Sequence, residues 1–246
     1  MALRVSHKIF LELEKAILSG HYKPHSRFPS ERELARIYAV SRPAVREAMA
    51  HLSELGLVKT LAQSGTYVTD YQTEGSLDLL VHIMKTTEVI DSGVLLSLLR
   101  FRRITAPFYA SQAALMAGPN DIEEFRIAGE VLIKSLGRKG KGTAKISESD
   151  FRFHSLIARM TKDLVFQLFF NSFKPIYRYY TDIYYNLPDS AQATIAFVND
   201  LTAAISSKDP DNAARIMDDA VIDAEKRLLT ALDLKAGKRT IPLKTP

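Results

Sequence analysis

Apolar residues recur at helical spacing from the start of the chain. Val5, Ile9, Leu13 and Ile17 stand four residues apart, which predicts a first helix with one buried stripe. Ser19-Gly20 ends this pattern. The stretch 21–29 has two prolines and little periodicity, which predicts an irregular connector to the next helix.

The residues after this connector carry the start signal of a short helix. Ser30-Glu31-Arg32-Glu33 is a capping box, in which the Ser30 hydroxyl accepts from the Glu33 N–H and the Glu33 carboxylate reaches back. Ala39-Val40 predicts a tight turn at the end of this helix.

A second capped helix begins at Ser41, and Pro43 stands in its first turn, where a missing N–H costs nothing. It is expected to run to Leu55, with Gly56 as a left-handed terminator. Two β-prone runs follow, Leu57–Leu61 and Gly65–Thr69, which predict a small hairpin closed by residues 62–64. The polar stretch 71–76 predicts a linker.

The rest of the chain has helical periodicity and predicts no strand between Leu77 and Leu234. The helices are placed at about 77–87, 91–117, 120–137, 147–160, 164–185, 189–207 and 210–233. The predicted fold is therefore mainly α. It comprises an N-terminal winged helix-turn-helix with a β-hairpin wing (1–72), an all-α helical-bundle domain for ligand binding and dimerisation (77–234), and a flexible tail (235–246).

Composition excludes several classes of protein. The 246 residues contain no cysteine, which excludes disulfides, thiolate zinc sites and thiol nucleophiles. The first residues hold charge every few positions and no long apolar run, so we expect no signal peptide, no membrane partner and a cytoplasmic protein. Residues 1–72 hold ten lysines and arginines against seven acidic residues, and this surplus suits a polyanionic partner at the N-terminus.

The second capped helix has the features of a DNA-reading helix. Its inward stripe is predicted to be Val45, Ala48, Met49, Leu52 and Leu55. That stripe turns Arg42 and Arg46 outward, four residues apart on one face. Two guanidinium groups so placed can each bind guanine O6 and N7 or a phosphate in the major groove. An exposed pair of arginines alone is ordinary surface, and the cap, the turn and the hairpin together favour the DNA-binding interpretation.

The segment PSERELARIYAVSRPAVREAMAHLSELGLV, followed by SGTYV, resembles the DNA-binding signature of the GntR family of bacterial transcription regulators. The resemblance covers about residues 5–70. It implies operator contacts from Arg32, Ser41, Arg42, Ala44 and Arg46, and a wing tip near the minor groove formed by Gln63, Ser64, Gly65 and Thr66. The wing of that family commonly begins with a basic residue and a glycine, where this chain has Leu61 and Gln63, which implies a weaker or differently aimed wing contact.

The helical remainder resembles the FadR-type (FCD) ligand domain of the same family, over about residues 77–233. The extra helix at 77–87 indicates the seven-helix subgroup. Arg102 and Pro107 match an Arg…Glu-Pro pattern of the family, with Ala106 in place of the acid. Because one winged helix buries too little groove surface for tight specific binding, we expect a homodimer that binds a pseudo-palindromic operator. Its expected effector is a small carboxylate or other anionic molecule.

Asp150 and His154 match an Asp-x-x-x-His pattern that binds a divalent metal in many relatives, together with two histidines from the last two helices. Those histidines are absent here, and their places fall near Val198 or Asn199 and near Asp219 or Ala220. One imidazole with carboxylates and amides makes a weaker, harder site than three imidazoles, so a divalent metal is an open alternative and no cofactor is assigned. The other alternative is a buried ion pair or hydrogen bond between Asp150 and His154.

An effector site is predicted inside the helical bundle, where pockets form between facing helices. Its candidate residues are Arg102, Asp150, His154, Tyr177, Arg178 and Asn199, with Tyr179, Tyr184 and Tyr185 as further hydroxyl donors. These cationic and hydroxyl groups suit a carboxylate or phosphate. The competing interpretation is that tyrosines at helical spacing belong to the core.

The residues bear on three possible functions: an enzyme, an architectural DNA binder and a ligand-responsive regulator. An all-helical metal-dependent phosphohydrolase needs a His-Asp dipeptide, and a serine hydrolase needs a Gly-x-Ser-x-Gly elbow; the chain has neither, so no enzyme is expected. The basic stretch 137–142 lacks the spacing of a phosphate-binding loop and predicts a surface loop. A constitutive architectural DNA binder, whose helical domain only dimerises, is the remaining alternative to a ligand-responsive regulator.

Overall fold

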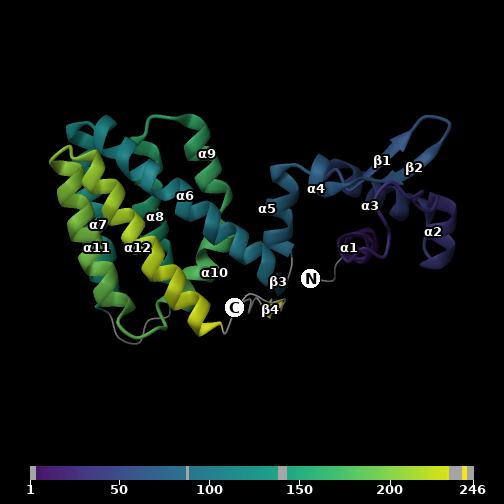
Figure 1. Ribbon diagram of the computed structural model, residues 1–246. Coiled ribbons are helices and arrows are strands. Elements are labelled where there is room, and N and C mark those ends of the chain that lie inside the picture. The colour runs from purple at the N-terminus through teal and green to yellow at the C-terminus, as the bar shows by residue number, and fades with distance from the viewer. Residues whose placement is uncertain (1–3, 87–88, 138–142, 233–239, 243–246) are drawn as a thin grey trace. The chain divides into compact units, whose positions relative to one another are not determined.

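The chain forms two compact units, one up to Ile83 and one from Met84 onward. They are described in a computed structural model that covers residues 4–86, 89–137, 143–232 and 240–242 (Figure 1). The basic loop expected at 137–142 and most of the expected tail fall outside these residues. The mainly helical fold class predicted from the sequence is confirmed in both units.

The first unit is a three-helix core with a hairpin. Its elements are α1 (Val5–Leu18), α2 (Glu31–Ile37), α3 (Arg42–Glu54), β1 (Val58–Leu61), β2 (Gly65–Val68), α4 (Tyr71–Glu74) and the first part of α5 (Leu77–Thr86). Ile9, Leu13 and Ile17 are buried as the spacing predicted, whereas Val5 is 53% exposed. Val5 is the first residue of α1, where no neighbouring turn covers it.

The local signals of the helix-turn-helix are confirmed. The Glu33 N–H donates to the Ser30 hydroxyl at 3.3 Å, and the Ser30 N–H donates to the Glu33 carboxylate at 2.8 Å, which completes the capping box. Ala39 takes a left-handed φ of 51° in the turn between α2 and α3. Gly56, with φ of 70°, ends α3 as expected.

The hairpin is wider than the sequence indicated. β1 and β2 pair antiparallel, from Val58 opposite Val68 to Leu61 opposite Gly65. The connector before α2 also pairs with β2, because the Phe28 N–H donates to the Thr66 carbonyl at 2.8 Å and the Val68 N–H donates to the Ser26 carbonyl at 3.0 Å. The supposedly irregular connector therefore lies along the outer edge of the wing.

The stretch predicted to be a linker is partly helical. Asp70 caps α4 by accepting from the Gln72 N–H at 3.2 Å. α5 then contributes to the first unit: Leu79 is buried in its core, and His82 pairs with the buried Glu14 of α1 at 2.9 Å. The change from the first unit to the second falls within α5, after Ile83, whereas the sequence pattern placed the linker at 71–76.

The second unit is a helical bundle. Its helices are α6 (Ser92–Met116), α7 (Pro119–Leu136), α8 (Ala144–Met160), α9 (Leu164–Ser172), α10 (Lys174–Tyr184), α11 (Ser190–Ser206) and α12 (Pro210–Ala231). Figure 1 shows α7, α8, α11 and α12 side by side. The single helix predicted over 164–185 is wrong, because Phe173 ends α9 and Pro175 stands in the first turn of α10, where it has no N–H to continue the helical ladder.

The expectation of no strand after Leu77 is also wrong. β3 (Val89–Asp91) pairs antiparallel with β4 (Thr240–Pro242), which lies within the expected tail. A strand of three residues is too short to show an alternating pattern, and its partner lies far along the chain. Neither strand could therefore be recognised by periodicity.

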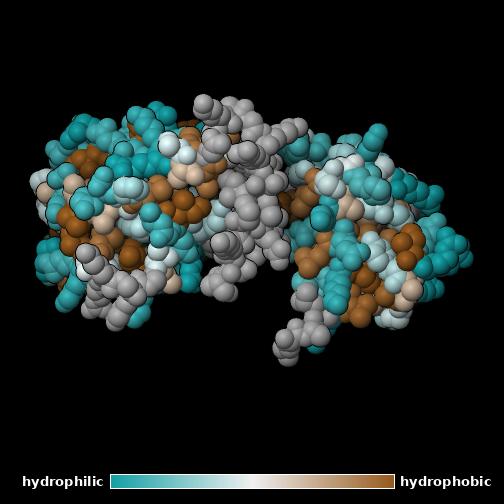
Figure 2. Space-filling view, turned by 90° about the horizontal axis from the view of Figure 1, so that it is seen from below, coloured by the Kyte–Doolittle hydropathy of each residue, from teal (hydrophilic) through white to brown (hydrophobic). Residues whose placement is uncertain are grey.

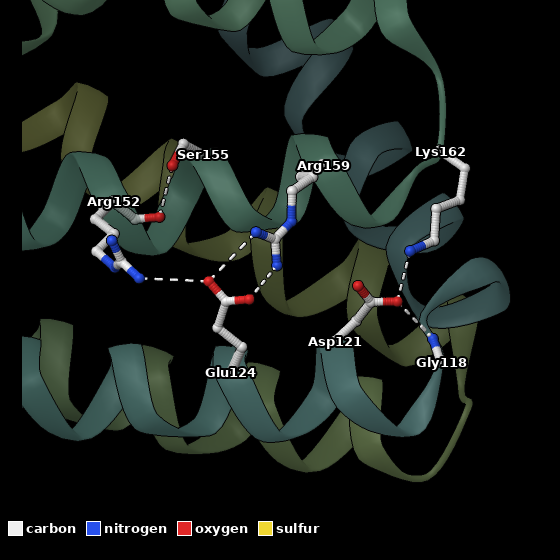
Figure 3. A network of polar contacts seen from close by, with 7 residues as sticks. All are labelled: Gly118, Asp121, Glu124, Arg152, Ser155, Arg159 and Lys162. Atoms are coloured by element: carbon white, nitrogen blue, oxygen red, sulfur yellow. Dashed lines mark hydrogen bonds and ion pairs between the residues drawn. The ribbon is translucent and has the colours of Figure 1, made fainter.

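Close packing and ion pairs hold α7 against its neighbours. The rings of Phe125 and Phe153 stack with centroids 4.3 Å apart, and both side chains are fully buried. Gly129 lets α11 approach, since a Cβ atom there would lie 2.8 Å from Val198. Figure 3 shows the polar edge of this contact. Glu124 of α7 forms ion pairs with Arg152 and Arg159 of α8. Asp121 forms an ion pair with the Lys162 ammonium at 2.6 Å. The Asp121 carboxylate also caps α7 by accepting a hydrogen bond from the Gly118 N–H.

Hydrophobic residues reach the surface of both units in patches among hydrophilic ones (Figure 2). In the second unit several belong to α6 and α9, where Ile104, Leu164 and Val165 are 76%, 65% and 71% exposed. Within the described residues, no helix is long and apolar enough to cross a bilayer.

Candidate functional site

The outer face of α3 presents the predicted DNA-reading residues. Val45, Ala48 and Met49 are buried, which leaves Arg42 and Arg46 exposed on the opposite side of the helix. Ala44 between them is half-buried. This is the geometry in which the N-terminal turns of a recognition helix carry the side chains that reach base edges.

The two arginines differ in their surroundings. Arg46 pairs with Glu31 of α2, with nitrogen–oxygen distances of 3.3 Å from both Nε and Nη2. Arg42 makes no ion pair within the described residues, and neither does the exposed Arg32 of α2. Arg42 is therefore available to bind a base or phosphate directly, whereas Arg46 has to leave the Glu31 carboxylate before it can bind DNA.

Ser41 occupies the N-cap position of α3, with extended φ and ψ of −69° and 146°, but its hydroxyl makes no capping hydrogen bond. The expected N-cap position of Ser41 is confirmed, but the side-chain hydrogen bond of such a cap is missing. The exposed hydroxyl is left available at the N-terminal end of a helix, where N–H groups and the helix dipole favour a phosphate.

The wing tip carries a cation that sequence reasoning missed. Gln63 and Gly65 have φ of 62° and 115°, which closes the turn, and Thr66 on β2 bonds to Thr60 across the hairpin at 3.0 Å. The guanidinium of Arg27 lies against Gly65, since Nε is 3.3 Å from the place of a Cβ atom there. Arg27 was assigned to an irregular connector, and only the long-range pairing of that connector with β2 brings the side chain to the wing.

The second unit encloses a cavity of about 350 Å³ between its helices. Four of the six predicted effector residues line it, namely Arg102, Asp150, His154 and Tyr177. Arg178 and Asn199 do not line it and are exposed. On α10, Tyr177 and Thr181 face inward, and Arg178 points about 100° away from Tyr177 because it is the next residue of the helix. Asn199 points outward for the same reason, since it follows the buried Val198 of α11.

Asp150 is the centre of a buried hydrogen-bond network. The Tyr177 hydroxyl donates to its Oδ2 at 2.7 Å, and the Tyr185 hydroxyl donates to its Oδ1 at 2.9 Å. His154 Nδ1 lies 2.8 Å from the Tyr177 hydroxyl and 3.1 Å from the Asp150 carbonyl. The ring of Phe197 stacks on the imidazole with centroids 5.6 Å apart.

These contacts define the hydrogen positions on His154. The Tyr177 hydroxyl has one proton, which it gives to Asp150, so His154 Nδ1 must be the donor toward the Tyr177 oxygen. Burial lowers the pKa of His154, and the charge of Arg102 lowers it further against the opposing effect of Asp150. A neutral imidazole protonated at Nδ1 leaves Nε2 as an acceptor, so the expectation of His154 as a donor to an anionic ligand is not supported by this geometry.

Arg102 and Tyr180 carry polar groups on the cavity wall that lack a partner among the described residues. The hydroxyl of Tyr180 is buried without a hydrogen bond within the described residues. Arg102 lines the same cavity and makes no ion pair with any described carboxylate, and its positive charge acts on the pKa of Tyr180 against the effect of burial, which raises it. Tyr180 was not predicted as a site residue, nor were four charged residues of the wall, namely Asp200, Arg215, Asp219 and Asp223. Five tyrosines lie close together in this part of the sequence. Only the packing of the helices determines which of them face the cavity.

Comparison with known proteins now identifies the chain. The model of the bacterial regulatory proteins of the gntR family matches residues 5–68, and that of the FCD domain matches residues 97–222, half of the chain. The chain belongs to the GntR family of transcription regulators, in its FCD branch. Like its relatives, it is a DNA-binding regulator and not an enzyme.

Full-length relatives support this assignment. The regulator is 28% identical to the HTH-type transcriptional regulator Mce2R of Mycobacterium tuberculosis, over 96% of each chain. It is 29% identical to the Uxu operon transcriptional regulator of Escherichia coli, over 70% of this chain and 65% of that one. A solved structure described as Lar, which controls the agr system of Listeria monocytogenes, shares the fold with a TM-score of 0.55 at 16% identity, over 96% of this chain and all of that one.

The metal site that the family resemblance implies does not fit this GntR regulator. Both oxygens of Asp150 already accept hydrogen bonds from Tyr177 and Tyr185. Within the described residues, no group of three or more histidine, aspartate or glutamate side chains is arranged to hold a metal ion. The arrangement favours the alternative from the sequence, a buried hydrogen-bonded pair, for Asp150 and His154.

Proposed function

We propose that this GntR-family protein is a ligand-responsive, sequence-specific regulator that acts in the cytoplasm. α3 and the wing bind operator DNA, and the cavity of the second unit binds a small anionic metabolite that alters operator affinity. The observation that carries the proposal is Arg102, a cation without a carboxylate partner among the described residues, on the wall of a cavity between helices. A charge held there is most favourable when a ligand supplies the opposite charge.

Relatives agree with an anionic effector. Two similar proteins of Escherichia coli are described as the galactonate operon transcriptional repressor and as a putative regulatory protein of the L-lactate dehydrogenase operon, each 26% identical to this chain. Both names refer to operons that concern carboxylic acids. This supports the ligand class proposed for the cavity without specifying its member.

A melting screen with the full-length protein tests the proposal. Carboxylic acids that bind the cavity are expected to raise the Tm in proportion to the logarithm of their concentration. The same acids are expected to change the affinity for an operator selected from random duplexes. A protein that binds this operator tightly and is neither stabilised nor released by any acid would instead be the architectural DNA binder considered above.

Arg27 is expected to supply the wing contact that the missing basic residue at the start of the wing supplies in relatives. Replacing Arg27 with alanine is expected to weaken operator binding about 3- to 10-fold and to reduce the slope of log K against log salt by about 1, because one phosphate contact is lost. Fluorescence anisotropy at several salt concentrations measures both. Lys23→Ala, in the same connector, is the matched control, and an equal slope change in both variants would show that only the net charge of the connector matters.

We also propose a homodimer, because one winged helix covers too little of the groove for tight specific binding. The exposed apolar residues of α6 and α9 are the proposed interface: Ile104, Phe108, Leu164, Val165 and Leu168. α6 and α9 are neighbours, since the rings of Phe108 and Phe166 lie 5.5 Å apart. Exposed apolar side chains on two neighbouring helices support an interaction site there, and two copies that face each other through these helices would cover them.

Ile104→Glu and Val165→Glu are expected to convert the dimer to a monomer without unfolding it, because both side chains are more than two-thirds exposed. Light scattering coupled to gel filtration measures the mass. Ile127→Glu, on α7 and 46% exposed, is the matched control and should leave the dimer intact. A dimer that survives Ile104→Glu and Val165→Glu but not Ile127→Glu would place the interface on α7.

A further inference from the structure

Most polar side chains on the cavity wall already have partners inside the protein. Tyr177 and Tyr185 are committed to Asp150. The hydroxyls of Thr105, Thr181 and Thr194 all donate to backbone carbonyls of their own helices. Arg215 pairs with Asp219 at 3.2 Å, and Asp223 pairs with Arg227 at 2.6 Å. The hydroxyls among these groups give their only proton to the protein, so they offer a ligand acceptor oxygens and no donor.

The Arg102 guanidinium and the Tyr180 hydroxyl still have protons to donate, and together they suit one carboxylate. The Arg102 guanidinium donates several N–H bonds in a plane, and the Tyr180 hydroxyl is a buried donor without a partner in the described part of the chain. Arg102 shares the cavity wall with Tyr180, Tyr177 and His154, and its charge lowers the pKa of all three groups.

The wall beside Arg102 is apolar. Phe101, Phe169 and Phe173 form a ring cluster, with Phe101 and Phe169 centroids 5.0 Å apart and Phe169 and Phe173 centroids 4.8 Å apart. The cavity wall also includes Leu98, Leu99, Ile157, Met217 and Leu228. Such a surface gains by covering an apolar ligand body and offers nothing to a hydroxyl group.

We propose that the cavity binds a monocarboxylate with an apolar body, alkyl or aryl, in preference to a polyhydroxylated sugar acid. This inference rests on the proposed function and specifies its ligand class. Arg102 and Tyr180 hold the carboxylate, and the phenylalanine cluster covers the body. Each hydroxyl of a sugar acid that enters without a partner loses its bonds to water and weakens binding by about tenfold or more.

Calorimetric titration of the full-length protein with defined acids tests the ligand class. The probes are butanoate, hexanoate, octanoate and phenylacetate against galactonate and glucuronate, with octan-1-ol as the uncharged control. Affinity is expected to rise about fourfold with each added methylene until the chain fills the cavity. Octanoate is expected to bind at least 100-fold more tightly than galactonate, and octan-1-ol to bind more weakly than octanoate.

Tyr180→Phe tests the assigned donor. The variant is expected to weaken octanoate binding about tenfold or more, because a hydrogen bond to a charged group is lost. It should not lower the Tm of the free protein, since the hydroxyl has no partner there among the described residues. Tyr179→Phe, one position away and outside the cavity wall, is the matched control and should bind octanoate like the unaltered protein.

The outcomes separate this inference from the proposed function. Galactonate binding that is tighter than octanoate binding and depends on Arg102 would overturn the apolar ligand class and leave an acid-responsive regulator. Octanoate binding that is unaffected by Tyr180→Phe would overturn the assigned carboxylate site. Absence of binding by every acid of both groups would overturn the inference and the proposed function together.

Discussion

Replacing Arg42 with alanine is expected to weaken binding to the preferred operator by about 1–3 kcal/mol, and to weaken binding to random DNA much less. Arg42 is exposed in the first turn of α3 and has no competing carboxylate within the described residues, so its guanidinium is free to bind a guanine edge. Arg46→Ala is expected to cost less, because Arg46 first has to leave Glu31. Anisotropy titrations on both DNAs measure these effects.

Glu31→Gln provides the control for this difference. Removing the carboxylate charge frees Arg46 and should strengthen operator binding, while Arg42 is unaffected. Losses of equal size on operator and random DNA for Arg42→Ala would show that Arg42 binds phosphate and reads no base.

Replacing Arg102 with alanine is expected to abolish the response to an anionic effector. The coupling between effector and operator is expected to be about 1–3 kcal/mol in the unaltered protein, which is a 5- to 150-fold change in operator affinity. The cation is removed from a cavity in the second unit, so operator affinity without effector should change little. Operator titrations with and without saturating acid measure the coupling.

Arg178→Ala is the matched control for Arg102→Ala. Arg178 is exposed on α10 and lies outside the cavity wall, so the response should be retained. A full response in Arg102→Ala, or an equal loss in both variants, would show that the ligand is held elsewhere or that surface charge alone is responsible.

The DNA-binding unit was predictable because its signals are local. The capping box at Ser30, the turn at Ala39 and the stripe from Val45 to Leu52 each depend on residues within a few positions, and their spacing encodes which side of α3 faces outward. Arg27 and Glu31 escaped this reasoning because their roles depend on contacts with β2 and α3 that sequence spacing does not encode.

The cavity was only partly predictable, for the same reason. Asp150 and His154 were recognised because they match the Asp-x-x-x-His pattern of the family, whose spacing of four places both side chains on one face of a helix. Tyr177 is buried, whereas its neighbour Arg178 is exposed. Which residues of α10 face inward depends on the helix break at Phe173, and periodicity did not predict that break. The rotation of α10 about its own axis also determines whether Tyr179 or Tyr180 lines the cavity.

The helix α5 extends the first unit beyond the wing. Seven of its ten residues, 77–83, belong to that unit. Leu79 is buried in its core, and His82 pairs with Glu14 on α1, the helix that packs against α3. The recognition helix therefore owes part of its support to residues that follow the wing in the chain, and a change in α5 would act on α3 through α1.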